Sequence, residues 1–402
     1  MEDKMARHAG VFIVCSLFLL VSCSNLQTGN SGPELLAPIP VYGAAPLVRV
    51  KLSKPSNADS VSVKVAKAML TIDGKRNETA GELSLARNGR QLLVNDQPAT
   101  SVEIAPVGLP QHFTLENRIY RGRLRVTAGP AGWEVINVVD LEQYVAGVIG
   151  WEMIAGWPLE ALKAQAVATR TYAVFEMEAA RGNGRAWDLD DTTAYQVYGG
   201  VGPADQPRQW RETPNVLAAR EATSGKIMTY QGKGFRAFFH STSGGHTISP
   251  PEGLGIDSVI PPLAGVDLGE FGKDSPKHRW RMSLAAGEVK ARLIEAGIAP
   301  ADIIRIEAAD TAPSGHAVTL KLFDRNGKHR LVSAISVRRA LGLFSTNFSA
   351  EKLAEEWVFE GRGYGHGCGM CQWSARGMAA AGWKGERILE TMYPGSELRS
   401  LY

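Results

Sequence analysis

The chain has 402 residues, 44% of them hydrophobic, and a formal net charge of +3. This length allows one large core or two modest cores, and the hydrophobic content is that of a globular protein. So small a charge gives no support to a dedicated nucleic-acid-binding role.

The N-terminal residues predict export and a lipid anchor. A short basic segment precedes an apolar run over residues 9–21, which is too short to span a bilayer comfortably and is typical of a signal peptide. The run ends in Leu-Val-Ser-Cys at Cys23, a pattern similar to a bacterial lipobox. We therefore expect residues 1–22 to be removed and Cys23 to carry lipid, which anchors the protein to a membrane facing the periplasm or the exterior. Ser24 favours the outer membrane where a cell has one; the alternative is an ordinary signal peptide with an incidental Cys.

Two regions follow before the main core. Residues 23–46 are rich in Gly, Asn, Ser and Pro without periodicity, which predicts a flexible tether. Residues 47–126 contain alternating apolar positions and the turn signals Asp73-Gly74 and Asn88-Gly89, which indicate short strands joined in hairpins. We expect residues 127–402 to form a mixed core, and the chain as a whole to be α+β.

The clearest helix is predicted over residues 158–176. Pro158 suits a first helical position, and Glu160 lies where the helix dipole favours an anion. Lys163 and Arg170 lie seven residues apart and therefore share a face, which is either a solvated basic face or one that points at a functional site. The apolar residues that we expect to be buried are Leu159, Leu162, Ala166 and Ala173.

Beyond this helix the pattern predicts short elements separated by Gly- and Pro-rich segments. Further helices are expected at 216–223, 284–296 and 336–341, strands at 135–139, 227–230, 235–240, 303–308, 317–323 and 329–332, and irregular segments at 199–214 and 250–277.

Glu152 is the strongest candidate for chemistry. It stands in the run Val-Ile-Gly-Trp-Glu-Met, residues 148–153. A lone carboxylate among large apolar residues is expensive to ionise, so it can hold a proton near neutral pH and donate it to a leaving oxygen. The alternative is a solvated Glu at a turn.

A second informative segment covers residues 361–373, where Gly occupies every other position up to Gly369. If this segment is extended, one face carries no side chains and another chain can approach it closely. Its opposite face would present His366 and Cys368. The Cys pair, Cys368 and Cys371, could form a disulfide, remain as thiols or bind metal.

Other side chains suggest further roles. His366 and the Cys pair could be metal ligands. His240 and His246 could complete a set of four, since two Cys and two His form a common zinc ligand set. Tyr195 and Tyr198 could stack on sugar rings, although most aromatic residues are core. The acidic run at 188–191 could supply a second carboxylate for a glycosidase or bind calcium, or be a solvated loop.

Taken together, these runs resemble the sporulation stage II protein D family, whose relatives include amidase-enhancer proteins. The resemblance covers most of the chain after the first β-rich part. It lies in residues 120–122, 137–142, 144–148, 152–153, 157–172, 192–198, 240–245, 363–377 and 393–395.

The resemblance implies a peptidoglycan lytic transglycosylase that cuts glycan strands, preferably strands without stem peptides. It identifies Glu152 as the catalytic residue, and matches Arg170 and Lys163 to basic residues of the active-site helix. A cation close to Glu152 would lower its pKa, so we expect Arg170 to be offset from it. We also expect substrate contacts from six residues: Lys163, Arg170, Tyr195, Tyr198, His366 and Gln372.

Some members of the family bind zinc through a segment similar to residues 240–246, which implies His240 and His246 as ligands here. Pro251 and Glu252 stand near the positions of the remaining ligands, however, and Cys368, Cys371 and Ser374 depart from the family's final motif. No other cofactor is implied. A cell-wall amidase is an expected partner, and the alternative function is a non-catalytic peptidoglycan-binding activator of such an enzyme.

Overall fold

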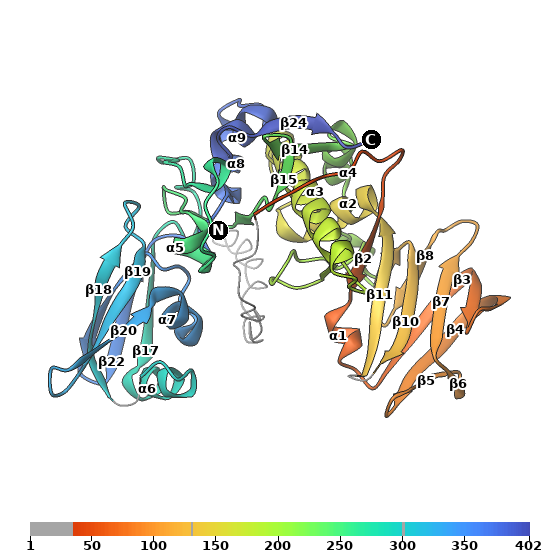
Figure 1. Ribbon diagram of the computed structural model, residues 1–402, viewed down its shortest axis with the longest axis horizontal. Coiled ribbons are helices and arrows are strands. Elements are labelled where there is room, and N and C mark those ends of the chain that lie inside the picture. Colours follow the sequence, from red (N-terminus) through yellow and green to blue (C-terminus); the bar gives the residue numbers. More distant parts are fainter. Residues whose placement is uncertain (1–34, 130–131, 300–301) are drawn as a thin grey trace, which may run out of the picture. The chain divides into compact units, whose positions relative to one another are not determined.

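The computed structural model describes residues 35–129, 132–299 and 302–402 (Figure 1). Helices and strands are mixed along this part of the chain, which confirms the α+β class. The signal peptide, the lipobox and Cys23 lie outside the described residues. Within those residues, no helix combines the length and the apolar content needed to cross a membrane.

Within the described residues, twelve strands of the first part of the chain form one sheet. Nine of them follow the order β12-β2-β11-β10-β7-β3-β4-β5-β6, and β8, β9 and β13 pair beside this path. The strands are β2 (Leu47–Lys51), β3 (Ser60–Ile72), β4 (Lys75–Asn88), β5 (Gln91–Val94), β6 (Gln97–Ala99), β7 (Ser101–Pro106), β8 (His112–Leu115), β9 (Arg118–Arg121), β10 (Arg123–Gly129), β11 (Gly132–Asp140), β12 (Leu189–Asp190) and β13 (Gly202–Pro203). Helix α1 (Ser53–Ser56) packs on β11. The predicted turn at Asp73-Gly74 joins β3 to β4, with both residues at positive φ.

Two of the expected boundaries are wrong. The boundary between residues 126 and 127 falls inside β10, because β10 and β11 pair along their length and both belong to the sheet. Part of residues 35–46, expected in the tether, packs on the core: β1 (Leu36–Ala37) pairs with β15 (Lys233–Phe235), and Leu35 and Ile39 are buried. The Pro and Gly content of this segment concealed the buried positions between them.

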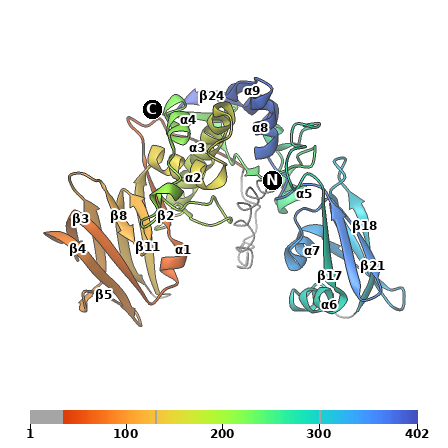
Figure 2. The ribbon, with the colours of Figure 1, turned by 180° about the vertical axis from the view of Figure 1, so that it is seen from behind.

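A helical layer carries Glu152. Helices α2 (Leu141–Glu152), α3 (Leu159–Gly182) and α4 (Pro214–Ala222) pack side by side (Figures 1 and 2). Helices α8 (Gln372–Ala380) and α9 (Gly385–Met392) also pack on α3, as does the small sheet β1-β15-β14-β24, in which β14 is Lys226–Tyr230 and β24 is Glu397–Ser400.

The predicted helix exists but is longer, and it begins one residue later. Pro158 is the N-cap of α3 rather than its first residue. Leu162, Ala166 and Ala173 are fully buried as expected, whereas Leu159 is 38% exposed because it opens the first turn.

Residues 127–402, expected to form a single mixed core, also contain a second hydrophobic core. Its residues include Trp280, Leu293, Leu320, Leu341 and Trp357. Its strands form two three-stranded sheets, with two helices beside them (Figure 1). The elements are β17 (Trp280–Ala285), α6 (Ala286–Glu295), β18 (Ile303–Thr311), β19 (Ala317–Asp324), β20 (His329–Ser333), α7 (Ala334–Leu341), β21 (Phe348–Leu353) and β22 (Glu356–Gly361). The elements predicted at 284–296, 303–308, 317–323, 329–332 and 336–341 are therefore confirmed within a few residues.

Two expected irregular segments contain short helical turns. A capping box between Ser249 and Glu252 starts α5 (Pro250–Leu254), where the two Pro residues stand at the helix start. Residues Pro261–Leu263 form the 3₁₀ turn η2, and Pro207–Gln209 form η1.

The Gly-rich segment is a loop and not the extended strand that alternation suggested. Its Gly residues from Gly363 to Gly369 have positive φ, which bends the chain around residues 238–248. It ends in β23 (Met370–Cys371), which pairs in parallel with β16 (Phe239–His240), so the strand expected at 235–240 is split. A close backbone approach does occur, but within the same chain and at a bend: a Cβ on Gly369 would lie 2.0 Å from the carbonyl oxygen of Phe238.

Replacing Gly369 tests this close approach. Gly369→Ala should lower the free energy of unfolding by about 3 kcal/mol or more, because it adds about 1–3 kcal/mol of overpacking to the cost of positive φ. The measurement is urea denaturation. Gly382 is the matched control, since it also has positive φ but nothing lies within 4 Å of a Cβ there. If Gly369→Ala costs no more than Gly382→Ala, the close packing of residue 369 on Phe238 is wrong.

Candidate active site

Helix α2 places Glu152 at its C-terminal end. The side chain of Asp140 caps the N-terminus by accepting hydrogen bonds from the N–H groups of Glu142, at 2.8 Å, and Gln143, at 3.3 Å. The helix ends at Glu152 because Met153 is extended, with φ −117° and ψ 156°. The C-terminal end of a helix carries partial negative charge, which disfavours a carboxylate there.

Glu152 as a residue is half-buried. Its carboxyl receives only uncharged contacts from the described residues. The N–H of Val197 donates to its Oε1 at 2.8 Å, and the side-chain amide of Gln372 also bonds to it. Burial raises the pKa of Glu152 above its ordinary value, and these two hydrogen bonds offset only part of that rise. Such a carboxyl holds its proton at higher pH than a solvated Glu does.

Close packing on α2 holds the loop that provides the Val197 N–H. A Cβ on Gly147 would lie 2.6 Å from the ring of Tyr198, so only Gly lets this ring lie against the helix. The hydroxyl of Tyr198 donates to Oδ1 of Asn137 on β11 at 2.8 Å. Tyr144 on α2 donates to Oε1 of Gln196 at 2.9 Å. Residues 196–198 are therefore fixed between α2 and the large sheet.

This arrangement corrects one expected substrate contact. Tyr198 is only 2% exposed, so its ring holds the loop and has no surface for a sugar. Tyr195, by contrast, is half-buried: it accepts a hydrogen bond from Arg185 at 3.0 Å and lies edge-on to Trp187, with ring centroids 6.1 Å apart. Trp187 also lies beneath Lys51 and Arg185. Trp187 was not predicted from the sequence, because a single Trp in a loop gives no local signal.

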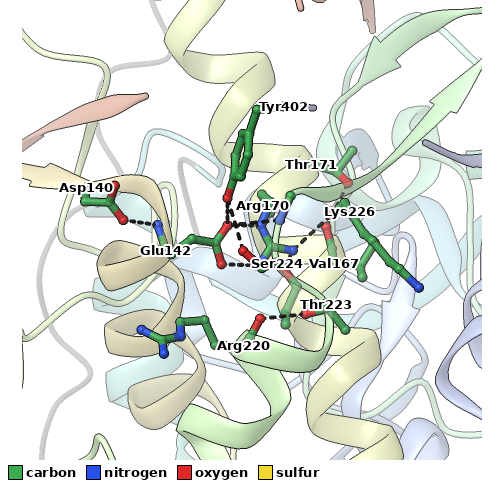
Figure 3. Close-up of polar contacts among 12 residues, drawn as sticks. Asp140, Glu142, Val167, Arg170, Thr171, Arg220, Thr223, Ser224, Lys226 and Tyr402 are labelled. Carbon is green, nitrogen blue, oxygen red and sulfur yellow. Dashed lines mark hydrogen bonds and ion pairs between the residues drawn. The ribbon is translucent and has the colours of Figure 1, made fainter. Parts of the chain in front are cut away.

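Arg170 is the centre of a buried ion pair (Figure 3). Its Nε and Nη2 donate to the two carboxylate oxygens of Glu142, each at 2.7 Å, and its Nη1 donates to the carbonyl of Lys226 at 2.9 Å. The hydroxyl of Tyr402 donates to Glu142 Oε1 at 2.6 Å. Burial acts to raise the pKa of Glu142, but the hydrogen bonds and charge of Arg170 outweigh it, so the pKa lies below its usual value.

The expectation that Arg170 contacts substrate is therefore wrong, because its side chain has no exposed surface. The expectation that it is not paired to Glu152 is confirmed, since its carboxylate partner is Glu142. The pair ties α2 to α3, and thereby fixes the helix that ends at Glu152. Glu142 was missed as a functional position because nothing in the sequence pairs it with a residue 28 positions away.

Lys163 is half-exposed near the start of α3. Its Nζ lies 2.8 Å from Glu160 Oε1, one turn earlier, and Glu160 also accepts the N–H of Gly385 at 2.7 Å. These contacts place Lys163 beside the start of α9, and its contact with substrate remains a prediction.

The histidines and cysteines lie near the Gly-rich loop. The ring of His366 accepts the N–H of Cys368 at 3.1 Å and lies 5.5 Å from the ring of His240. Burial lowers the pKa of His240 to about 4 and that of His366 to about 3, so both rings are neutral at pH 7. His366 is half-buried, and its predicted contact with substrate stays a prediction.

The residues present do not fit the expected zinc site. No group of three or more His, Cys, Asp or Glu side chains in the described part of the chain is arranged to hold a metal ion. His246 bonds to the carbonyl of Thr247, and Glu252 caps α5 instead of approaching the histidines. Cys368 and Cys371 are buried free thiols. Cys371 Sγ caps α8 by accepting the N–H groups of Ser243 and Ser374.

The acidic run 188–191 supplies local structure. Asp188 pairs with Arg49 at 2.6 Å, Asp190 accepts from Thr192, and Asp191 accepts the N–H of Ser53 at 2.9 Å. Each carboxylate thus has its own partner. Neither of two surface hollows, of about 380 and 480 Å³ on the N-terminal strands, includes Glu152.

The ion pair gives a stability prediction. Arg170→Met should lower the free energy of unfolding by about 3–5 kcal/mol, because it leaves Glu142 buried without its charge partner. Replacing both residues, Glu142→Leu with Arg170→Met, should recover much of that loss. Lys226→Met is the control: its exposed pair with Glu386 should contribute about 1 kcal/mol or less. Urea denaturation measures all three, and equal losses for Arg170→Met and Lys226→Met would contradict the assigned pair.

The sequence matches known protein families and proteins. The sequence profile of a family described as Stage II sporulation protein matches residues 130–230, which contain α2, α3 and the 192–198 loop. A profile for a domain of unknown function matches residues 267–369, the region of the second core.

Named relatives agree with the profile. Stage II sporulation protein D of Bacillus subtilis is 29% identical over 82% of this chain and 90% of its own length. Stage II sporulation protein D of Bacillus amyloliquefaciens is 32% identical over 65% of this chain and 74% of its own length. The amidase enhancer of Bacillus subtilis is 29% identical over 58% of this chain but only 37% of its own length. The chain belongs to the stage II sporulation protein D family.

Proposed function

We propose that this protein is a peptidoglycan lytic transglycosylase with Glu152 as its acid and base. The observation that carries the proposal is a carboxyl whose pKa is raised by burial and which is contacted by Val197 N–H and Gln372, and by no charged side chain among the described residues. A protonated carboxyl near neutral pH is what departure of a sugar oxygen requires. The family membership supports the same reading.

In the proposed reaction, neutral Glu152 protonates the glycosidic oxygen that follows N-acetylmuramic acid, and the bond from that oxygen to C1 breaks. The Glu152 carboxylate then takes the proton from the C6 hydroxyl of the same sugar. The C6 oxygen bonds to C1, which closes a 1,6-anhydro ring and returns Glu152 to its neutral form. The two proton transfers balance, and no water enters the product.

One carboxyl suffices for this scheme, and the surroundings of Glu152 suit it. A hydrolase that uses two carboxyl groups would need a second carboxylate across the scissile bond. Within the described residues, the acidic side chains at 188, 190 and 191 are bonded to Arg49, Thr192 and Ser53. Arg170 is neutralised by Glu142, so it does not lower the pKa of Glu152.

The substrate that we propose is glycan without stem peptides, reached by a protein that a lipid on Cys23 anchors in the cell envelope. Tyr195 and Trp187, both half-buried, are the aromatic side chains that we expect to contact sugar rings. Zinc has no part in the scheme.

A second candidate function rests on the similarity to the amidase enhancer. In that case the protein binds peptidoglycan and activates an amidase without cutting glycan itself. The two functions differ in one result, since only the first releases anhydro-sugar ends from purified glycan in the absence of any amidase.

Replacing the acid tests the catalytic role. Glu152→Gln keeps the shape and the Val197 hydrogen bond but has no proton to donate, so release of anhydro products should fall by about 10²–10⁴-fold. Mass spectrometry of digests of denuded glycan measures it. The control is Glu390→Gln, an exposed position on α9, which should retain wild-type rate. Wild-type release by Glu152→Gln removes Glu152 from the reaction.

The pKa direction gives a pH prediction. Because the free enzyme must carry a proton on Glu152, kcat/KM should fall as pH rises through the raised pKa of this group. The midpoint of that fall should lie above about 4.3, the ordinary value for Glu. A midpoint at or below the ordinary value would mean that the group responsible is not a desolvated Glu152.

A further inference from the structure

A row of buried amides leads away from Glu152 into α3. Gln372, the first residue of α8, bonds to Glu152, and its Nε2 donates to Oε1 of Gln165 at 3.4 Å. Gln165 in turn donates from its Nε2 to the hydroxyl of Thr169, one turn further along α3, at 3.1 Å. Gln165 and Thr169 are fully buried, and Gln372 is 5% exposed.

The hydrogen bonds in this row are directed so that Glu152 accepts, as an ionised carboxylate does. Gln372 donates N–H groups both to Glu152 and to Oε1 of Gln165, and Gln165 donates its own N–H to Thr169. An ionised carboxylate only accepts hydrogen bonds, so the arrangement suits Glu152 after it has given up its proton.

The donors and acceptors in this row can also be reversed while the heavy atoms stay nearly in place. A Gln side chain has nearly the same shape after its amide is turned over, which exchanges its oxygen and its nitrogen. With both amides turned, Gln372 accepts from protonated Glu152 and from Gln165, and Gln165 accepts from the Thr169 hydroxyl. A hydroxyl both donates and accepts, so Thr169 can end the row in either direction.

We propose that Thr169, Gln165 and Gln372 form a reversible relay that keeps Glu152 hydrogen-bonded both as an acid and as a carboxylate. The proposal rests on the proposed function, because a residue that acts first as an acid and then as a base needs a partner suited to both states. Gln165 and Thr169 do not contact Glu152, so they act as positioning residues through Gln372.

The other groups around Glu152 do not serve this purpose. The Val197 N–H only donates, and so it favours the carboxylate alone. Tyr144 is the titratable side chain with which Glu152 interacts, and its hydroxyl is committed to Gln196. Among the described residues, no charged side chain shifts the pKa of Glu152. Among the described residues around Glu152, the relay is therefore the only partner that can both donate a hydrogen bond to Glu152 and accept one from it.

A matched pair of variants separates the relay from mere packing. Thr169→Val has the same shape but no hydroxyl, and Thr169→Ser keeps the hydroxyl and loses a methyl group. The relay predicts about three- to tenfold lower kcat for Thr169→Val, with KM unchanged, and near wild-type kcat for Thr169→Ser. Gln165→Met should lower kcat by tenfold or more. Equal kcat for Thr169→Val and Thr169→Ser would overturn the proposal.

A second measurement does not depend on activity. In a ¹⁵N NMR titration of the folded wild-type protein, the side-chain NH₂ signals of Gln372 and Gln165 should shift together, with one midpoint. Both shifts should disappear in Glu152→Gln. If the Gln165 signals do not respond while those of Gln372 do, the relay is wrong.

The two measurements also separate this proposal from the proposed function. If wild-type protein cuts no glycan but the two Gln residues still titrate together, the transglycosylase activity fails and the relay stands. If glycan is cut but Gln165 neither titrates nor affects kcat, the activity stands and the relay fails.

Discussion

The removal of water from the Glu152 carboxyl is the constraint on which the rest of this site depends. A carboxyl at the C-terminal end of a helix, buried among uncharged contacts, is costly to ionise. Any cation brought close to it would cancel that effect. The basic residues of α3 are bonded elsewhere: Arg170 pairs with Glu142, Lys163 with Glu160, and Arg181 with Glu178.

The Glu142–Arg170 pair contributes to the same site without contacting Glu152. Glu142 lies near the start of α2 and Glu152 at its end, so fixing the first to α3 fixes the position of the second. Tyr402 and the carbonyl of Lys226 complete the hydrogen bonds of the pair. A buried ion pair adds little net stability, but removing one partner strongly destabilises the folded protein, because the other charge is left buried and unpaired. This explains how Arg170 can matter to the site without touching a substrate.

The features that could be predicted from the sequence are those set by residues close together along the chain. The α3 helix, the hairpin at Asp73-Gly74 and the unusual setting of Glu152 all follow from local pattern. The sequence could not predict the partner of Arg170 or the burial of Tyr198, because both depend on contacts between residues far apart in the chain. The Gly-rich loop was misread for a related reason: alternate Gly residues suit a strand with one bare face, but they also suit a chain that bends at positive φ.

The second core was missed on different grounds. Strands β18, β19 and β20 and helices α6 and α7 were predicted, whereas strands β17, β21 and β22 were not. Nothing in a local pattern shows which elements share a core. Gln165 and Thr169 did leave a signal, since two polar residues four apart interrupt the apolar face of α3. Polar residues at such positions are buried only where they bond to each other or to a partner, and here the partner leads to Glu152.

The central claim is that one carboxyl acts in turn as acid and base, with the sugar's own C6 hydroxyl as the attacking group. Digestion of denuded glycan in H₂¹⁸O tests it most directly, because ring closure takes no oxygen from water. Mass spectra of the new ends should show anhydro sugars without ¹⁸O. New ends that carry ¹⁸O would show that water attacks, which would contradict the account.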